Sequence, residues 1–328
     1  MKRKVLHLGT AAILCAVTLW LFGWLSETGQ QDKLVAAILF TQTGRWMLEE
    51  ETQPVATEPE PVTPQQETPP KPEKTAPPFL LTESTAQMVR ISNQAGYPVD
   101  LDALLQQPLS WDLMQEAPAV LILHTHGSES YVNTEGYVES SDYRTLDEAY
   151  NMISVGEHLA ACLEAVGIRV IHDRTAYDYP SYSGSYNQAR AALQRHLEEN
   201  PSICLVLDVH RDAMADSSGQ QLGYTCQTEA GTAAQLMLVA GTDAGGLEFP
   251  NWQENLALAV KLQAVLKTEC ADICRPISLR TGRYNQDVFP NMLLVEVGAA
   301  GNTRQEALLA VEVLARGLLV LAKGTEYA

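Results

Sequence analysis

Short apolar runs alternate with segments of helical periodicity between residues 119 and 324. Each apolar run has the length of a buried strand, whereas the segments between the runs repeat apolar residues every three to four positions. Such alternation is typical of the α/β class, in which a mostly parallel sheet carries helices on both faces. The predicted strands are 119–124, 168–173, 204–210, 236–242 and 292–298, and the predicted helices are 146–167, 185–201, 251–269 and 303–324.

The chain before this region predicts a membrane anchor. Residues 6–25 are apolar and match the roughly 20 residues that cross a bilayer. Basic residues precede this run and Glu27 follows it, which predicts a cytoplasmic N-terminus over 1–5, a transmembrane signal-anchor over 6–25 and an extracytoplasmic remainder. A cleaved signal peptide is the alternative. The uncleaved anchor is favoured because the run ends in Trp and Phe residues rather than in a small-residue cleavage site.

Residues 26–84 are predicted to link this anchor to a catalytic domain over 85–328. Within the linker, 51–78 are rich in Pro, Glu, Thr and Gln, a composition that cannot bury a core and favours extended, disordered chain. Residues 34–48 are apolar but too short to span a membrane. They form either an interfacial helix or a short segment that packs on the distant domain.

The net charge and the cysteine spacing argue against a nucleic-acid-binding protein and against a cysteine zinc site. The formal net charge of −18 argues against nucleic acid as a partner, which would require a basic surface. The cysteines show no CxxC spacing, so a cysteine zinc site is not expected. Cys162 and Cys204 lie in apolar patterns and are interpreted as core residues, while the four-residue spacing of Cys270 and Cys274 leaves a disulfide open.

Two histidines and a glutamate stand at the ends of three predicted strands: His126, His210 and Glu296. The carboxyl ends of strands in an α/β sheet are where such folds collect their sites. Two histidines and one carboxylate make a catalytic zinc ligand set that leaves a fourth position for water. A further carboxylate then serves as general base for that water. The leading hypothesis is a zinc hydrolase.

The strand-end string HTHGSE offers more than one ligand. His124 and His126 share a face while the strand lasts, and Gly127 is expected to end the strand and turn Glu129 back towards the same point. The predicted zinc ligands are therefore His126, Glu129 and His210. His124 is predicted to support a ligand or to line the cleft.

Glu296 is the predicted general base, because a lone carboxylate in an apolar strand is costly unless it is paired or functional. A buried ion pair is the alternative. Asp208 shares the strand face of His210 and is predicted to orient its imidazole. Arg211 is predicted to bind substrate, with an internal ion pair as the alternative. The tyrosine-rich segment 172–190 is either a substrate-binding lip or an ordinary loop.

These motifs resemble, in order, those of the stage II sporulation protein P family of spore-forming Firmicutes, which are membrane-anchored cell-wall hydrolases. The resemblance runs from about Ile91 to the C-terminus, and an N-terminal anchor and linker match it. More distantly, the domain is similar to zinc-dependent N-acetylmuramoyl-L-alanine amidases, whose two strand-end histidines and C-terminal glutamate match His126, His210 and Glu296. The strings that carry the family resemblance are HTHGSESY (124–131), NMISVGEHLAACLEAVGIRVIHDRT (151–175), DYPSYSGSYNQAR (178–190), LDVHRDA (207–213) and LLVEVGAAGNT (293–303).

The resemblance leaves the carboxylate ligand open. Those amidases take it from the start of the first helix, where this chain offers Asp147 or Glu148. The close spacing of His126 and Glu129 instead resembles zinc carboxypeptidases. Glu129 is the first choice and Glu148 the alternative. Asn302, within the last of the family strings, is also predicted to bind substrate.

The resemblance further implies a substrate, a cofactor, partners and a location. The implied reaction is zinc-dependent hydrolysis of the amide between the N-acetylmuramoyl lactyl group and L-alanine in peptidoglycan, during engulfment of the forespore. The implied partners are the stage II sporulation proteins D and M, and the catalytic domain is expected outside the cell membrane. A stem-peptide endopeptidase, alone or in addition, is one alternative. A non-catalytic wall-binding scaffold is another.

Overall fold

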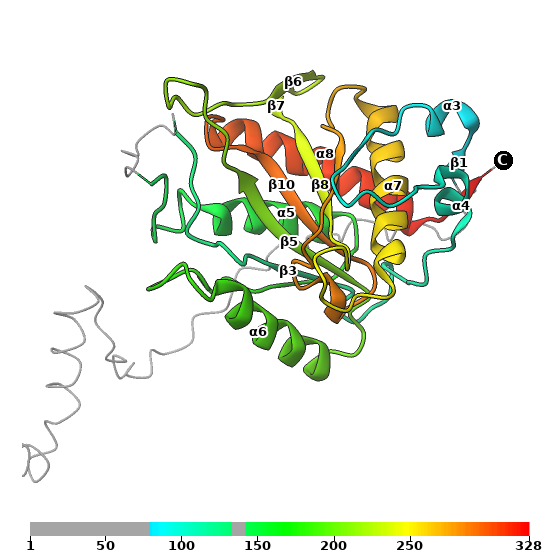
Figure 1. The fold of residues 1–328 in the computed structure, drawn as a ribbon, viewed down its shortest axis with the longest axis horizontal. Coiled ribbons are helices and arrows are strands. Elements are labelled where there is room, and N and C mark those ends of the chain that lie inside the picture. Colours follow the sequence, from blue (N-terminus) through cyan, green and yellow to red (C-terminus); the bar gives the residue numbers. More distant parts are fainter. Residues whose placement is uncertain (1–78, 133–141, 328) are drawn as a thin grey trace, which may run out of the picture. The chain divides into compact units, whose positions relative to one another are not determined.

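The computed structural model describes residues 79–132 and 142–327, and its centre is a seven-stranded sheet (Figure 1). Every pair of neighbouring strands in this sheet is parallel except β8 with β10. The prediction of a mostly parallel α/β sheet is confirmed. In spatial order the strands are β2 (Ile91–Asn93), β9 (Ile277–Leu279), β8 (Leu236–Ala240), β10 (Met292–Ala299), β5 (Leu205–Asp212), β3 (Val120–Leu123) and β4 (Val170–His172).

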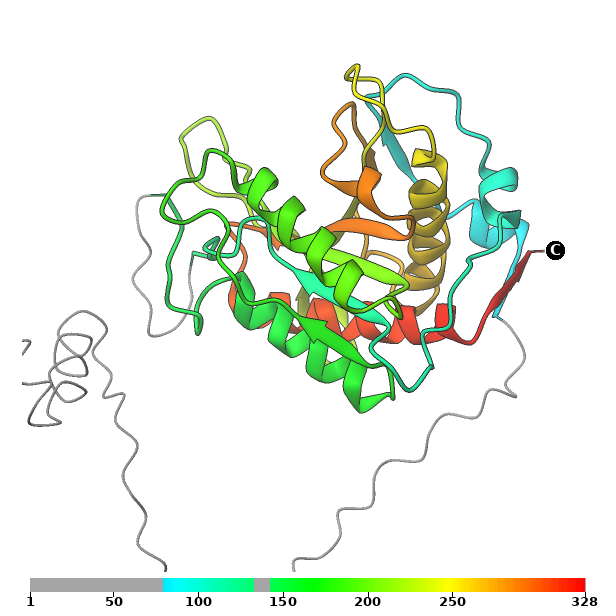
Figure 2. The same cartoon turned by 90° about the horizontal axis from the view of Figure 1, so that it is seen from below.

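Helices cover both faces of the sheet, as predicted. Helices α5 (Met152–Ala165), α7 (Trp252–Glu269) and α8 (Arg304–Ala322) pack on one face, and α6 (Ser185–Glu199) packs on the other (Figure 2). Alternate residues of each strand therefore face different helices. In β10, Leu293, Val295 and Val297 join the larger core, whereas Met292 and Leu294 face the α6 side.

Helix α5 begins later than its sequence periodicity predicts. The predicted helix starts at residue 146, but the side chain of Asn151 accepts a hydrogen bond from the backbone N–H of Ile153 and caps the helix there. A capping asparagine satisfies an N–H group of the first turn that has no partner within the helix, so the helix begins directly after it. Residues 146–150 consequently lie in a turn outside the helix.

Several short elements surround the sheet. β1 pairs in parallel with β11, so the segment 79–84, predicted as linker, joins the folded domain next to the C-terminus. A hairpin, β6–β7, lies beside α8. The bounds of the small elements are β1 (Phe79–Leu81), α3 (Glu83–Ala86), α4 (Leu101–Gln106), β6 (Thr225–Thr228), β7 (Gly231–Ala234), η1 (Gln286–Val288) and β11 (Thr325–Tyr327).

No helix in the described parts of the chain is long and apolar enough to cross a membrane. The predicted anchor, 6–25, and the Pro- and Glu-rich stretch, 51–78, lie outside the described residues.

Candidate active site

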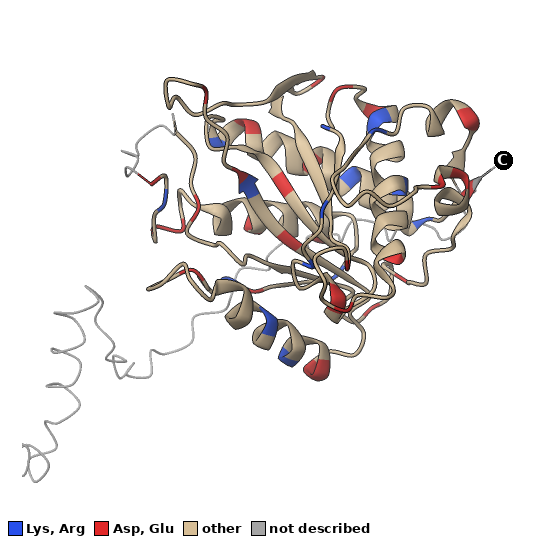
Figure 3. Cartoon of the chain, in the orientation of Figure 1, with Lys and Arg blue, Asp and Glu red and all other residues tan. Residues whose placement is uncertain are grey.

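The predicted site residues converge at the carboxyl ends of two central strands. Glu296 on β10 and His210 on β5 are register partners. Figure 3 shows charged residues mainly on helices and loops, with a few on β5 and β10, where Asp208 and Glu296 lie. His126 lies just beyond the end of β3, and its ring centroid is 5.2 Å from that of His210.

A tight turn brings Glu129 to the same place. The backbone N–H of Glu129 donates to the carbonyl oxygen of His126 at 3.2 Å, which closes the turn around Gly127. Oε2 of Glu129 then lies 3.6 Å from Nδ1 of His210, and the side chain is buried. Burial alone would raise the pKa of Glu129, but His210 and Arg211 lower it to about 2. The return of Glu129 to the strand-end histidines is thus as predicted.

Two carboxylates flank His210, one on each ring nitrogen. Oδ1 of Asp208 lies 2.8 Å from Nε2, opposite the contact of Glu129 with Nδ1. Asp208 is held by the backbone N–H and the hydroxyl of Thr125, at 2.8 and 2.6 Å. Burial alone would lower the pKa of His210, but Asp208 and Glu129 hold it well above its usual range. Asp208 therefore has the position of an imidazole-orienting residue.

Two buried polar atoms of this cluster, Nδ1 of His126 and Oε2 of Glu296, have no hydrogen-bond partner among the described residues. Nε2 of His210 has its ion-pair partner in Asp208, at 2.8 Å. Buried polar groups are nearly always hydrogen-bonded, so such a concentration requires a reason. Within residues 79–132 and 142–327, no three His, Cys, Asp or Glu side chains stand in the arrangement of a metal site. The donor types nevertheless fit zinc, which binds imidazole nitrogen and carboxylate oxygen.

Glu296 occupies an environment that disfavours its charge. Burial raises its pKa to about 8, and the negative charges of Glu129 and Asp212 add to the effect, while His210 and Arg211 oppose it. A carboxyl group with this pKa exchanges its proton near neutral pH, as general acids and bases do.

His124 packs towards helix α5 rather than towards Tyr182 and Tyr186 as His126 does, because the strand ends before the two histidines and its shared face is not kept. Strand β3 ends at Leu123, and the imidazole of His124 lies under Gly156 of helix α5. Its Nδ1 is 2.8 Å from the carbonyl oxygen of Val209, and its Nε2 is 2.9 Å from Nε2 of His172. Burial lowers the pKa of His124 to about 3. The His124–His172 pair thus packs between β3 and helix α5.

Glu148 does not approach the site. Because α5 begins only at Met152, Glu148 lies in the preceding turn, where its carboxylate contacts Arg174 at 2.5 Å and is 47% exposed. The structure brings Glu129, and not Glu148, to the histidines.

The two predicted substrate-binding residues are used inside the protein. The buried guanidinium of Arg211 donates to the carbonyl oxygens of Ser130 and Tyr143 and lies 3.5 Å from Oε1 of Glu129, which is the internal ion pair left open above. The amide of Asn302 bonds to the backbone of Tyr224 and Ala299 and to a neighbouring carboxylate. All four hydrogen-bonding positions of this amide are occupied. Asn302 therefore stabilises the turn after β10 and has no position left to bind a substrate.

The tyrosine-rich segment after β4 covers one side of the site. The ring of Tyr182 stacks on His126 at 4.3 Å, and the guanidinium of Arg144 lies 4.1 Å above the same tyrosine ring. Tyr186 contacts His126 edge-on at 5.5 Å. Tyr182 remains 50% exposed. The segment is therefore part of the site, which its composition alone left undecided.

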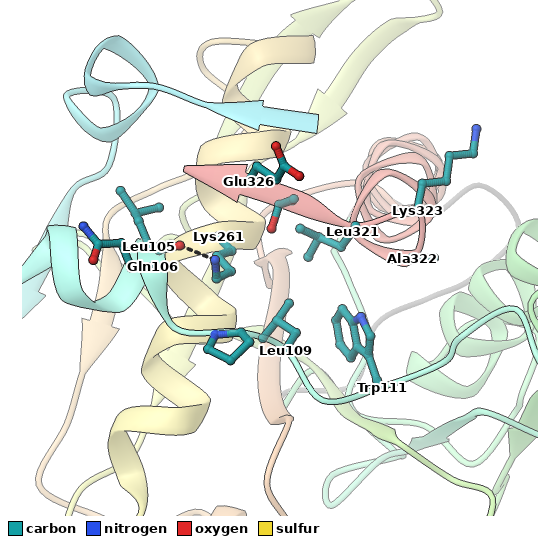
Figure 4. Close-up of a pocket in the computed structure, with 12 residues that line it drawn as sticks. Leu105, Gln106, Leu109, Trp111, Lys261, Leu321, Ala322, Lys323 and Glu326 are labelled. Atoms are coloured by element: carbon teal, nitrogen blue, oxygen red, sulfur yellow. Dashed lines mark hydrogen bonds between the residues drawn. The ribbon is translucent and has the colours of Figure 1, made fainter. Parts of the chain in front are cut away.

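A separate cavity of about 540 Å³ lies among the segment after α4, helix α7 and the C-terminal residues (Figure 4). Lys261 lines it and donates to the carbonyl oxygen of Leu105 in the last turn of α4. This contact satisfies a helix-terminal carbonyl that has no partner within the helix. None of the predicted site residues lines this cavity.

Fold and site together define an α/β protein with a cluster of histidines and carboxylates at the carboxyl ends of adjacent parallel strands. The chain belongs to the stage II sporulation protein P (SpoIIP) family, whose model matches residues 34–319. Stage II sporulation protein P of Bacillus subtilis (strain 168) is 25% identical over 198 residues. The matched part is 57% of this chain and 47% of the relative, so the chain spans about half of the relative's length.

Among solved structures, the chain is similar to three N-acetylmuramoyl-L-alanine amidases. The enzyme from Clostridium difficile 630 is 16% identical with a TM-score of 0.39, over 64% of this chain and 99% of that one. AmiC2 of Nostoc punctiforme is 17% identical with a TM-score of 0.37, over 62% and 95%. The CwlD amidase from Clostridioides difficile, in complex with the GerS lipoprotein, is 15% identical with a TM-score of 0.38, over 62% and 95%. Likenesses of this extent carry no conclusion about activity.

Proposed function

We propose that this chain is a membrane-anchored, zinc-dependent peptidoglycan hydrolase of sporulation that cleaves the amide between N-acetylmuramic acid and L-alanine. Membership of the family supports a role in sporulation. The observation that carries the chemistry is that buried His126 and Glu296, each with an unpartnered polar atom, converge with His210 and the ionised carboxylate of Glu129.

The residues that would hold zinc are His126, His210 and Glu129. Two imidazoles and one carboxylate are a hydrolytic zinc set, and the unpartnered Nδ1 of His126 is an atom that such an ion would satisfy. His210 would contribute Nδ1, which faces Glu129, because its Nε2 faces Asp208. Asp208, itself fixed by Thr125, keeps the imidazole of His210 in one orientation. When bound, the metal supplies Lewis acidity towards the scissile carbonyl and acidifies water.

The protein's own residues supply positioning and proton transfer. Arg211 holds the carboxylate of Glu129 and the backbone of the neighbouring loop, so this carboxylate is fixed before substrate arrives. Glu296 accepts a proton from the attacking water at Oε2 and returns it to the amine nitrogen that leaves. Tyr182, stacked on His126 and half exposed, forms the wall of the site that meets the substrate.

A second candidate is hydrolysis of peptide cross-links between stem peptides. The turn that places Glu129 three residues after His126 favours it, because this ligand spacing resembles zinc carboxypeptidases. Cleavage of both bonds by the same site is compatible with this chemistry, since both are amides. A catalytically silent wall-binding scaffold has less support, because it gives no reason for the unpartnered atoms at the strand ends.

The proposed location is the cell membrane, with one crossing and the catalytic domain outside the cytoplasm. The apolar run 6–25 and the basic residues before it support this topology. We further propose the stage II sporulation proteins D and M as partners in wall hydrolysis. Protease accessibility of the domain in intact protoplasts tests the topology independently of activity.

The experiment that tests the activity uses the full chain purified in detergent and incubated with peptidoglycan sacculi. One sample contains zinc and the other a chelator, and a Glu296→Gln variant is the matched control. Mass spectrometry is expected to show new lactyl carboxylates and new L-alanine amino termini in the zinc sample alone. Cut cross-links without lactyl carboxylates favour the endopeptidase. Equal product in the chelated sample would refute the zinc hydrolase.

A further inference from the structure

Two cysteines that lie far apart in the sequence meet beside the β6–β7 hairpin. Sγ of Cys226, on β6, lies 3.9 Å from Sγ of Cys270, the residue that caps the C-terminus of α7. The two residues are 44 positions apart. The four-residue spacing in the sequence left a disulfide between Cys270 and Cys274 open. All three cysteines are free thiols in this structure.

We propose that Cys226 and Cys270 form a disulfide that fastens the β6–β7 hairpin to the end of helix α7. The two sulfur atoms are already near van der Waals contact, so small side-chain rotations bring them to bonding distance. Cys226 lies within β6 and Cys270 directly follows α7, so the bond would join two regular elements.

The surroundings of the two thiols define the order of reaction. Cys270 is half-buried and lines an open cavity of about 720 Å³, together with residues such as Thr228, Asp272 and Arg316. Cys226 is buried, and burial together with Cys270 raises the pKa of its thiol to about 12. An oxidant that enters the cavity therefore meets Cys270 first, and Cys226 completes the bond.

The chemistry is two successive thiol–disulfide exchanges with a small or protein-borne disulfide as oxidant. Sγ of Cys270 attacks one sulfur of the oxidant, forms a mixed disulfide and releases one thiol, which takes the proton of Cys270. Sγ of Cys226 then attacks the Cys270 sulfur, forms the internal bond and releases a second thiol with the proton of Cys226. Two cysteine thiols are oxidised, and one external disulfide is reduced to two thiols.

This bond would stabilise two segments that contact the ends of β10 and β5, the strands that carry the candidate site. Tyr224, two residues before Cys226, exchanges hydrogen bonds with the side-chain amide of Asn302 in the turn after β10. The ring of Tyr224 lies 4.1 Å from the guanidinium of Arg275, which in turn contacts Asp212 at the end of β5 at 2.8 Å. The cross-link therefore joins the two segments that brace the ends of β10 and β5.

The experiment compares the full chain in detergent after incubation with reduced or with oxidised glutathione. Free thiols are blocked with N-ethylmaleimide, and the protein is digested without reduction for mass spectrometry. The expected result is a linked pair of peptides containing Cys226 and Cys270 in the oxidised sample alone. Neither the zinc content nor the location of the protein enters this test, so its outcome is independent of the proposed function.

Thermal unfolding gives a second measurement. Oxidation is expected to raise Tm by on the order of 5 °C or more, because a loop of this length loses substantial chain entropy in the unfolded state. Cys226→Ser and Cys270→Ser are each expected to abolish the rise, while Cys204→Ser, at a half-buried thiol directly before β5, is expected to keep it. Free Cys226 and Cys270 thiols in folded, oxidised protein, or a bond from either to Cys274, would overturn the proposal.

Discussion

Glu296 and His210 are register partners on the adjacent parallel strands β10 and β5. Oε2 of Glu296 is buried without a hydrogen-bond partner among the described residues, whereas the imidazole of His210 is held between Glu129 and Asp208. A group proposed to move protons thus lies directly beside a group proposed to hold metal. Because the two roles belong to different strands, single substitutions can separate them.

Glu296→Gln is expected to keep bound zinc and to lose turnover. The amide preserves the shape of the side chain but cannot accept and return a proton, and general acid–base catalysis contributes roughly 10²–10⁴-fold. Metal content by elemental analysis and product release from peptidoglycan check the two parts separately. Glu148→Gln, at an exposed carboxylate bound to Arg174, is the matched control and is expected to behave as the wild type. Near-normal turnover in Glu296→Gln would remove Glu296 from the reaction.

The carboxylate ligand can be assigned by comparing four variants for zinc affinity. Glu129→Gln is expected to lose zinc, since Glu129 is the carboxylate beside Nδ1 of His210. Asp208→Asn is expected to weaken zinc binding by roughly 10–100-fold, the effect of removing a residue that orients a ligand. His210→Ala is expected to lose both zinc and turnover. Loss of zinc in Glu148→Gln, with retention in Glu129→Gln, would assign the ligand to the turn before α5.

Tyr182→Ala is expected to reduce kcat/KM by roughly 2–10-fold, mainly through KM. The variant removes the ring that stacks on His126 and carries Arg144, and aromatic pairs of this kind contribute about 0.5–1.5 kcal/mol. Tyr182→Phe keeps the ring and is expected to stay within about twofold of the wild type. Tyr179→Ala, a change of another exposed tyrosine in the same segment, is the control. Kinetics on a soluble muropeptide measure all three, and an equal loss in Tyr179→Ala would indicate a general effect on the loop.

Much of the fold follows from the apolar patterns, because long buried strands and amphipathic helices leave strong periodic signals. The direction of strand β8, by contrast, cannot be predicted from its apolar pattern. A strand buried on both faces has the same apolar sequence whether its neighbour is parallel or antiparallel, so the antiparallel pairing of β8 with β10 has no sequence signature. The three-residue strands β2 and β9 are too short to show any period.

Some site residues could likewise be predicted from sequence patterns, and others could not. His126, His210 and Glu296 could be brought together from sequence because strand ends share one edge of the sheet. The orientation of His124 could not, because it depends on β3 ending one residue before it. Asn302 and Arg211 look available as polar residues near strand ends, and only the three-dimensional hydrogen bonds show that both are used internally. The contribution of Tyr182 depends on loop packing, for which the sequence has no periodic signal.

Asp173→Asn is expected to make stability less dependent on acid pH. Burial alone would raise the pKa of Asp173, but hydrogen bonds from Tyr177, Thr175 and His196 lower it below the ordinary value of 3.8. The ionised form is therefore the one that the fold stabilises. This contribution is complete above about pH 4 and is lost as the pH falls through the lower pKa of the folded state.

The expected difference in unfolding free energy between the wild type and Asp173→Asn is about 2 kcal/mol at pH 7 and pH 5. It should shrink at pH 3, where the wild type begins to bind the proton. Urea denaturation of metal-free protein at the three pH values measures it. A difference that stays constant down to pH 3 would mean that the charge of Asp173 contributes nothing.

Gly156→Ala is expected to destabilise the protein although alanine is the better helix former. Gly156 lies within α5, and an added Cβ would collide with the imidazoles of His124 and His172. Helix propensity alone predicts a gain of about 1 kcal/mol for this change. Overpacking of a dense interior costs about 1–3 kcal/mol, and the two rings cannot retreat easily, because His124 is fully buried and bonded to Val209.

Ala161→Gly, on the exposed side of the same helix, is the matched control. It removes only propensity, so it should lower the unfolding free energy by about 1 kcal/mol, while the catalytic parameters stay unchanged. Gly156→Ala should lower both stability and turnover, because displaced imidazoles push on the segment that carries His126. Stabilisation by Gly156→Ala in urea denaturation would show that the histidine pair is not packed as tightly as its contacts indicate.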